Sequence, residues 1–432
     1  ELVNNLVTLI TTTDLSDSEG GSDHIEGNDF GDYILGGVAG DELHGEAYLY
    51  NGLGVAALVQ SAGADTILGD EGRLRFDVTG DLVPVTATYT ALADGDPRTL
   101  DLIETFATGT LGGDDDIYGN DGSDVAMGGF GDDLIHGDFY ENHLSDLVRA
   151  LNPGNDDLLG DGGQKYFQNE HVILLRTSEY GQGGSDTIHG NDGNDTVVGG
   201  AFGDLLYGET DADNLDLAAG RAGEDAMLGD NARLDWTLPD DDILGRQDVI
   251  DEFYGTTVPI DPFDPTIGWL TLDRVTTIQP TDGGNDVIYG NGNSAAEKGD
   301  AIFGGTGNDT IYGDTDEDAP NGVDGVDGGD LLFGDHGKLY PSLPGFENFF
   351  TNNNFFSIDT READGANTDG IDDVHNDFRD VIWGNAGSDI LIGGQDDDIL
   401  FGGTQDDDLI GGHNVAGGMD ELDDMPLSLI HI

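Results

Sequence analysis

The sequence predicts an all-β protein built from parallel β-roll (β-solenoid) segments that carry inserted β-hairpins and a short helix. Three observations predict this fold class. Gly supplies 71 of the 432 residues, Asp and Glu total 89 against 14 Lys and Arg, and a short motif of Asp, an apolar residue and Gly recurs along the chain. Asp accounts for 71 of the acids, and Asp favours turns and oxygen coordination over helices. With 36% hydrophobic residues, the chain can still bury a core.

The recurring motif reads Asp-x-U-x-Gly, where U is Ile, Leu, Val, Met or Ala. Its Asp anchors are nine residues apart within groups such as 23–32–41 and 380–389–398–407. The Gly-rich half predicts a tight turn and the x-U-x half a very short strand with one inward side chain, so that successive turns stack as a roll. The anchors are the candidate metal ligands: Asp23, Asp32, Asp41, Asp65, Asp115, Asp124, Asp133, Asp156, Asp186, Asp195, Asp204, Asp225, Asp286, Asp300, Asp309, Asp330, Asp380, Asp389, Asp398 and Asp407.

The net charge of −75 predicts that the chain binds cations. Self-repulsion of this size opposes a compact state, and clustered carboxylates and turn carbonyls are the hard oxygen ligands that Ca²⁺ prefers. One Ca²⁺ per anchor would add about +40 and leave about −35. The same charge excludes nucleic acid as a direct partner. The absence of Cys excludes disulfides and thiolate metal sites, and no apolar run is long enough to span a membrane.

The fuller copies of the motif resemble a known family. They read Gly-Gly-Phe-Gly-Asp-Asp-Leu-Ile-His at 128–136 and Gly-Gly-Thr-Gly-Asn-Asp-Thr-Ile-Tyr at 304–312, which is similar to the RTX (haemolysin-type calcium-binding) nonapeptide repeat. The resemblance implies that several Ca²⁺ ions lie between neighbouring turns, held by a carboxylate of one turn and carbonyls of the stacked turn. Phe30, Ala39 and Phe202 stand where the family has Gly, so weaker binding is expected there.

A longer repeat organises the motifs into modules. Three nonapeptides are followed by an excursion, a fourth anchor, a Gly-Asp dipeptide and two strand-like stretches that predict a hairpin or small sheet. The first stretches lie at 68–76, 159–167, 228–236 and 333–340, and the second at 102–105, 174–177, 275–278 and 357–360. The predicted modules are 1–22 (a partial module with a return strand), 23–114, 115–185, 186–285, 286–379 and 380–432 (a partial fifth module).

The excursions carry their own signals. Leu144, Leu147, Val148 and Leu151 follow helical spacing after Asp138 and predict a short amphipathic helix capped by that residue. Acids also follow the third repeat elsewhere, and the sequence leaves open whether these cap a segment or bind further Ca²⁺. They are Glu46, Asp138, Glu209 and Asp314.

Histidines and basic residues leave two further questions open. His44, His136 and His189 precede Gly in their repeats and should point outward, as solvent-exposed side chains rather than as a transition-metal stripe. Eight basic residues fall in the strand-like stretches, either as ordinary surface charges or facing the acidic rolls of a neighbouring module. They are Arg73, Arg75, Lys165, Arg176, Arg233, Arg274, Lys338 and Arg361.

No sequence motif of a known catalytic class stands out, and the leading hypothesis is structural rather than enzymatic. It is an extracellular or cell-surface calcium-binding repeat protein that folds on Ca²⁺ binding, as a filament, surface-layer or adhesin-stalk subunit. One alternative is the RTX export and folding module of a secreted toxin or hydrolase. A second alternative is a repeat-built carbohydrate-active enzyme, and contact with a cell surface or carbohydrate stays open.

The two ends of the sequence suggest self-association. Leu6–Thr11 resembles a return strand, and Leu427–Ile432 is an apolar stretch with no expected partner downstream. Exposed strand edges invite pairing with another chain. We therefore expect head-to-tail assembly, in which the first strand of one subunit completes the last module of the next, or alternatively a longer array of which this is a segment.

Overall fold

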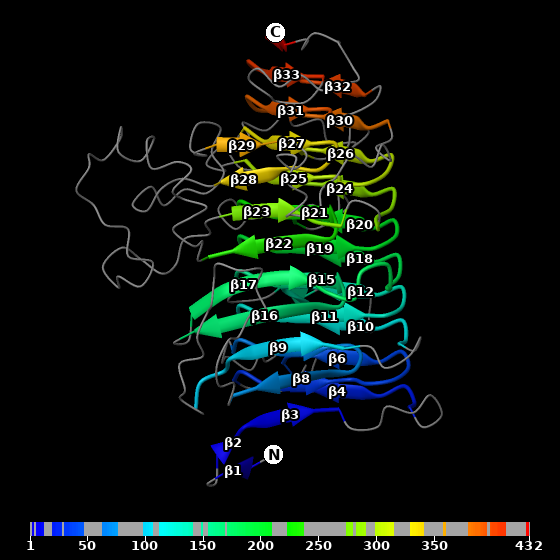
Figure 1. Cartoon of the computed structure of the whole chain (residues 1–432), viewed down its shortest axis with the longest axis vertical. Coiled ribbons are helices and arrows are strands. Elements are labelled where there is room, and N and C mark those ends of the chain that lie inside the picture. The colour runs from blue at the N-terminus through cyan, green and yellow to red at the C-terminus, as the bar shows by residue number, and fades with distance from the viewer. Residues whose placement is uncertain are drawn as a thin grey trace, which may run out of the picture.

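Short β-strands stack along the long axis of the computed structural model to form an elongated solenoid (Figure 1). The parts that the structure describes contain strands and turns without any helix, and so no helix that could cross a membrane. The described residues are 2–3, 6–12, 20–27, 30–46, 63–76, 98–106, 112–140, 148–149, 154–168, 171–209, 223–236, 274–279, 282–290, 299–314, 329–340, 357–359, 379–394, 398–411 and 429–431.

Two parallel sheets face each other across the roll, and each motif contributes one strand in alternation. The first, here called the outer sheet, has ten strands. In spatial order they are β4 (His24–Glu26), β6 (Glu42–His44), β10 (Asp116–Tyr118), β12 (Leu134–His136), β18 (Thr187–His189), β20 (Leu205–Tyr207), β24 (Val287–Tyr289), β26 (Thr310–Tyr312), β30 (Val381–Trp383) and β32 (Ile399–Phe401).

The second sheet, here called the central sheet, has ten parallel strands and one antiparallel strand at its C-terminal end. Its members in spatial order are β5 (Tyr33–Leu35), β7 (Thr66–Leu68), β11 (Val125–Gly129), β15 (Asp157–Asp161), β19 (Thr196–Gly200), β21 (Ala226–Asp230), β25 (Ala301–Phe303), β27 (Leu331–Phe333), β31 (Ile390–Ile392), β33 (Asp408–Ile410) and β34 (Leu429–His431).

The apolar residue U of each motif builds the core between these two sheets. Ile117 of β10 is in register with Leu43 of β6 and Ile135 of β12, and all three are fully buried. Because strand side chains alternate between faces, a three-residue strand sends one side chain inward. Burying an Ile or Leu contributes about 1.5–3 kcal/mol, so the roll gains its hydrophobic stabilisation one layer at a time.

A third sheet covers the other face of the central sheet. This hairpin sheet has nine antiparallel strands: β3 (Leu9–Thr11), β8 (Gly72–Arg75), β9 (Leu102–Thr105), β16 (Gly163–Gln168), β17 (His171–Thr177), β22 (Ala232–Asp235), β23 (Arg274–Thr277), β28 (Lys338–Tyr340) and β29 (Ser357–Asp359). The sequence predicts separate hairpins or small sheets, whereas these stretches join into one sheet along the molecule. Leu68, Met127 and Leu159 of the central sheet pack with Leu74, Ile103 and Leu175 of the hairpin sheet in a second core.

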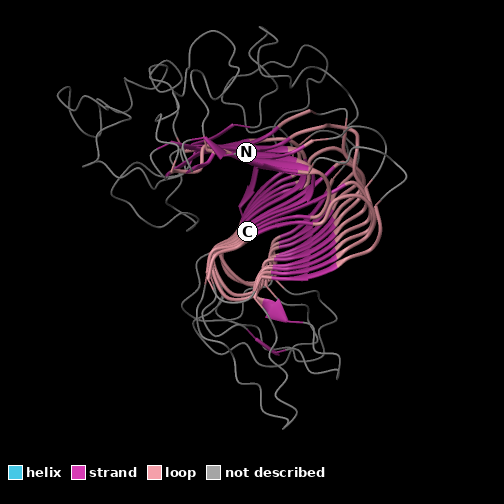
Figure 2. Cartoon of the chain, turned by 90° about the horizontal axis from the view of Figure 1, so that it is seen from below, coloured by secondary structure: helices cyan, strands magenta, loops and turns pink. Residues whose placement is uncertain are grey.

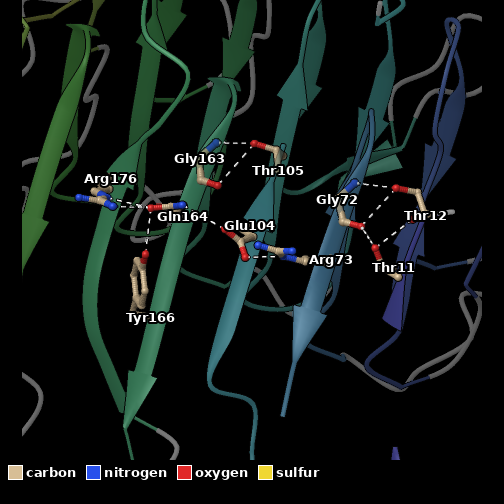
Figure 3. Close-up of polar contacts among 10 residues, drawn as sticks. All are labelled: Thr11, Thr12, Gly72, Arg73, Glu104, Thr105, Gly163, Gln164, Tyr166 and Arg176. Carbon is tan, nitrogen blue, oxygen red and sulfur yellow. Dashed lines mark hydrogen bonds and ion pairs between the residues drawn. The ribbon is translucent and has the colours of Figure 1, made fainter. Parts of the chain in front are cut away.

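A repeated contact fixes the register within the hairpin sheet (Figure 3). Thr105 Oγ1 accepts a hydrogen bond from the Gly163 N–H at 2.8 Å and lies 3.5 Å from the Gly163 carbonyl oxygen, to which it donates. Thr12 makes the same pair of contacts with Gly72. Thr177 repeats them with Ala232, and Thr277 with Gly337. The hydroxyl, both donor and acceptor, satisfies the backbone where each chain segment leaves the central sheet.

Several basic residues of the predicted hairpins pair with acids of the hairpin sheet itself. Arg73 contacts Glu104, and Arg233 and Arg274 both contact Asp235. Lys165 instead reaches Asp157 in the central sheet, 2.5 Å from its carboxylate. Each of these four ion pairs joins residues of a single predicted module, so none of them supports the hypothesis that the basic residues face the acidic roll of a neighbouring module. Arg361 lies outside the described residues.

Two expectations about local structure were wrong. Val148 and Arg149 form strand β14 (Val148–Arg149), antiparallel to β13 (Phe139–Tyr140), where the sequence predicts a helix; the rest of 144–151, apart from these two residues, lies outside the described residues. The C-terminal stretch Leu427–Ile432, which was expected to lack a partner, contains β34, and β34 pairs with β33. At the other end, β1 (Leu2–Val3) pairs with β2 (Leu6–Val7), and β3 pairs with β8. Both strands invoked for exchange between subunits therefore have partners within the chain.

The three degenerate copies keep a positive φ at the position where their relatives have Gly. Phe30, Ala39 and Phe202 have φ of 76°, 90° and 73°, in the region that favours glycine. A side chain with a Cβ pays about 1–2 kcal/mol there. The Phe202 side chain is 50% exposed, so little packing offsets this cost.

Replacing Phe202 by Gly should therefore stabilise the protein. We expect Phe202→Gly to raise the free energy of unfolding by about 1 kcal/mol in urea denaturation with Ca²⁺ present. Phe202→Ala is the matched control, because it removes the ring and keeps the Cβ. Equal stabilisation by Ala and Gly would show that the positive φ is not the cause.

Candidate calcium sites

The twenty anchor aspartates fall into two columns of ten along the solenoid. The first column precedes the outer-sheet strands and contains Asp23, Asp41, Asp115, Asp133, Asp186, Asp204, Asp286, Asp309, Asp380 and Asp398. The second precedes the central-sheet strands and contains Asp32, Asp65, Asp124, Asp156, Asp195, Asp225, Asp300, Asp330, Asp389 and Asp407. Viewed along the solenoid, the turns between the strands superpose (Figure 2).

One hydrogen bond repeats along each column. Apart from the last anchor of each column, the backbone N–H of every anchor donates to Oδ1 of the next anchor in the same column, at 2.7–3.2 Å. The bonded pairs are close in sequence, as for Asp115 and Asp133, or far apart, as for Asp41 and Asp115. Alternate anchors are therefore neighbours in space, since each coil of the roll uses two motifs.

The second carboxylate oxygen of many anchors is buried without a hydrogen bond. Seventeen anchors are buried; Asp23, Asp32 and Asp398 are more exposed. Oδ2 accepts no hydrogen bond in Asp32, Asp41, Asp65, Asp115, Asp124, Asp133, Asp156, Asp186, Asp195, Asp204 and Asp286. A buried charged oxygen without a partner is costly, and its repetition at equivalent positions indicates that these oxygens share one role.

Each such oxygen lies in a cradle made by glycine and a neighbouring coil. A Cβ at Gly160 would clash with Asp186 Oδ2 and would lie 2.7 Å from the carbonyl oxygen of Gly199 in the next coil. A Cβ at Gly45 would likewise clash with Asp65 Oδ2 and the carbonyl oxygen of Gly119. Carboxylate and carbonyl oxygens from stacked coils thus converge, and this all-oxygen set fits Ca²⁺.

The burial of adjacent acids changes their proton affinity. Burial raises the pKa of Asp115, Asp124 and Asp286 each to about 8, and that of Asp65 to about 6. The pKa of Asp195 is raised well above its usual value by burial, and further by the charges of Asp156 and Asp225. Without a cation, the folded state therefore favours protonated carboxyls near neutral pH at Asp115, Asp124 and Asp286.

A second set of buried acids stabilises the turns where excursions leave the roll. Glu46 accepts the N–H groups of Gly63 and Asp121 at 3.3 and 3.2 Å, and Asp138 accepts that of Gly154 at 3.3 Å. Glu209 and Asp314 accept backbone N–H groups in the same way. Of the two roles that the sequence left open for these acids, backbone capping is the one that the hydrogen bonds show, and Asp138 caps a turn rather than a helix.

The Gly-Asp dipeptides after the fourth anchors supply capping residues that the sequence reasoning missed. Asp161 accepts the N–H groups of Gly184 and Ala201, at 3.2 and 2.5 Å. Asp70 and Asp230 make equivalent pairs of bonds to the turns beside them. Asp335 occupies the same sequence position, and a Cβ at Gly394 would clash with its carboxylate. The invariable Gly-Asp at these points was the available signal.

The outward-facing histidines belong to an aromatic stack. The rings of His44, Tyr118, His136, His189, Tyr207, Tyr289, Tyr312, Trp383 and Phe401 follow one another at 4.5–5.4 Å, tilted by at most 13°. His44 is buried and His136 and His189 are half-buried, so the expectation that all three are solvent-exposed was wrong. Burial lowers the pKa of His136 to about 4, which keeps its ring neutral.

Comparison with known families identifies the motif. A family model of the RTX calcium-binding nonapeptide repeat (4 copies) matches residues 110–139, 180–206, 189–222, 296–320 and 376–412. These segments include anchors of both columns. A search of the curated proteins found no match.

Substitutions of two neighbouring aspartates, Asp115 and Asp116, would distinguish a candidate ligand from an acid that does not bind Ca²⁺. Asp115 is buried in the first column, whereas Asp116 is exposed on β10. We expect Asp115→Asn to weaken Ca²⁺ binding at its coil on the order of tenfold, because the site loses a charged ligand, and to lower the melting temperature in Ca²⁺. Asp116→Asn should leave both unchanged in calorimetric titration and thermal melting. Equal effects of the two changes would exclude the anchor as a ligand.

The raised pKa values predict acid stabilisation of the metal-free fold. An unfolded Asp has a pKa of about 3.9, so the folded chain binds more protons than the unfolded chain between about pH 4 and pH 8. The free energy of unfolding of the metal-free protein therefore falls as the pH rises through this window. Circular dichroism of the demetallated chain should show more strand at pH 4 than at pH 8. A strand signal that is constant, or that grows with pH, would contradict the proposed burial of the anchors.

Proposed function

This chain carries RTX calcium-binding nonapeptide repeats, and we propose from that premise that it is an extracellular structural rod, which folds when Ca²⁺ fills its two columns of aspartates. The observation that carries the proposal is the continuity of the columns. Each runs from the first coil to the last, through excursions of different length, linked by the same N–H···Oδ1 bond.

The anchors and turn carbonyls would hold the ions. Between Asp65 and Gly119, or between Asp186 and Gly199, oxygens of two coils face one space. Bound Ca²⁺ supplies positive charge that offsets the repulsion among the carboxylates and links successive coils. The chain itself supplies the framework, since Oδ1 is already used to position each carboxylate and Oδ2 is left for the cation.

Secretion would provide the switch between unfolded and folded states. With affinity on the order of 10⁻⁴–10⁻³ M, as in extracellular calcium modules, the columns would fill outside the cell and stay empty at cytosolic calcium levels. The unfolded acidic chain would then be competent for export. This supports an extracellular or cell-surface location.

The architecture supports a structural role over catalysis. In the described residues, many of the buried acids belong to the two columns or bind turn N–H groups, and Glu104 and Asp235 pair with arginines of the hairpin sheet. The hairpin sheet thickens the roll along its length, as suits a filament, surface-layer or stalk element (Figure 1). Head-to-tail assembly would use strands at the ends of the sheets, such as β4 and β32 of the outer sheet. The strands first invoked for exchange, β3 and β34, each already pair with one neighbour within the chain.

The alternative role is a folding and export module of a secreted toxin or hydrolase. Its coils would have the same calcium chemistry, so the site geometry favours neither role. Electron microscopy and sedimentation of the purified chain in Ca²⁺ distinguish them: ordered filaments or sheets support the assembling rod, and dispersed monomers support the module.

Calcium should control folding of the whole chain. At neutral pH we expect strand circular dichroism and an elongated scattering profile in millimolar Ca²⁺, and loss of both on chelation, because unneutralised buried carboxylates destabilise the roll. Mg²⁺ at the same concentration is the control, since it demands a smaller octahedral site and keeps its waters. Folding that survives chelation, or that Mg²⁺ restores equally well, would contradict the proposal.

A further inference from the structure

Two histidines and two glutamates alternate on the outward face of the first two outer-sheet strands. β4 and β6 pair in parallel, with His24 in register with Glu42 and Glu26 in register with His44. Side chains two residues apart share a face of a strand. The four side chains therefore form a two-by-two arrangement in which each imidazole lies beside a carboxylate on the other strand.

One carboxylate lies between the two imidazoles. Glu42 Oε2 is 3.0 Å from His24 Nδ1, and Glu42 Oε1 is 3.1 Å from His44 Nε2. One ligand atom from each of these three residues lies within 4.8 Å of the others. In a tetrahedral zinc site with bonds of about 2.0–2.1 Å, neighbouring ligand atoms are about 3.4 Å apart, so small side-chain rotations would suffice to surround an ion.

The surroundings orient both rings for ligation. His24 Nε2 is 3.1 Å from Glu26 Oε1; with the proton on Nε2 and donated to this carboxylate, Nδ1 is left with its lone pair toward Glu42. Such a carboxylate behind a ligating histidine is the usual support of a metal site. The ring of His44 stacks on Tyr118 at 4.7 Å, with 7° between the planes, which restricts its rotation.

We propose that His24, Glu42 and His44 form a site for a divalent transition-metal ion, with Zn²⁺ as the representative ion. Two imidazoles and a carboxylate suit this class of ion, whereas Ca²⁺ takes oxygen ligands. The site is open on one side, because the His24 side chain is 47% exposed and that of Glu42 34%, and water would complete the coordination. The ion would join the terminal strand β4 to β6 and so stabilise the end of the outer sheet.

The test uses the full chain saturated with Ca²⁺, so that the aspartate columns do not compete for the added metal. Zn²⁺ binding is measured by calorimetric titration, and Co²⁺ is added separately as a spectroscopic probe whose visible absorption reports nitrogen and oxygen ligation. We expect one Zn²⁺ site per chain. His44→Phe keeps a ring in the stack but removes the ligand nitrogen, and Glu42→Gln removes the charged ligand; each should weaken Zn²⁺ binding tenfold or more.

His136→Phe is the matched control, because His136 lies in the same aromatic stack, two strands along the outer sheet from β6. It should bind Zn²⁺ as the unmodified protein does and give the same Co²⁺ spectrum. The proposal is overturned if the Ca²⁺-saturated protein binds no Zn²⁺, or if His44→Phe and Glu42→Gln bind it as tightly as His136→Phe.

Discussion

Two rows of carboxylates must be buried side by side for this chain to fold, and the rest of the structure depends on how that burial is made tolerable. Apart from the first anchor of each column, each anchor uses Oδ1 to accept the N–H of its neighbour in the column, while Oδ2, as in Asp186, lies in a cradle of glycine and carbonyl oxygen. The hydrogen bond fixes the carboxylate but leaves its charge uncompensated. A roll of this kind is therefore stable only when protons or cations occupy the columns, and at neutral pH the cation that suits an all-oxygen site is Ca²⁺.

The remaining contacts make a continuous rod out of repeats that are interrupted by long excursions. Acids such as Glu46 and Asp161 bind the backbone of turns where the chain leaves or re-enters the roll. The hairpin sheet buries the second face of the central sheet, and the Thr–Gly contacts hold its register. On the opposite side, the aromatic stack covers the outer sheet with rings that lie nearly parallel to one another. Each device repeats once per coil or per module, so stability accumulates along the axis.

Much of this architecture could be predicted from the sequence, because the motif encodes it locally. Gly at fixed offsets predicts the turn and U predicts the inward side chain, so the roll follows from the spacing. The ligand role of the twenty regular Asp residues stays a prediction. The pairing of Asp41 with Asp115 could not be predicted in the same way, since it depends on an excursion leaving and rejoining the roll without shifting its register.

The predictions that failed depended on short stretches with ambiguous patterns. The apolar spacing around Val148 covers only two turns of a helix, and a run of that length does not distinguish helix from strand; the structure pairs Val148 with Tyr140. The C-terminal stretch pairs with β33, which is itself a strand of the repeat. Nothing in the composition of β33 indicated that an antiparallel strand would pair with it. A readable signal was overlooked in the central sheet, where Leu68, Met127 and Leu159 occupy the position that holds His44, Tyr118 and His136 in the outer sheet. Apolar residues at this position indicate that the outward face of the central sheet is buried, and the hairpin sheet packs on that face.

Anomalous diffraction from crystals grown in Ca²⁺ would test the central claim most directly, because it locates the ions without reference to folding or stability. The account predicts peaks in two lines along the solenoid, each peak beside an anchor Oδ2 and a carbonyl oxygen of the neighbouring coil, as between Asp186 and Gly199. Columns without peaks in a folded, Ca²⁺-containing crystal, with calcium bound only at surface acids such as Asp116, would contradict it.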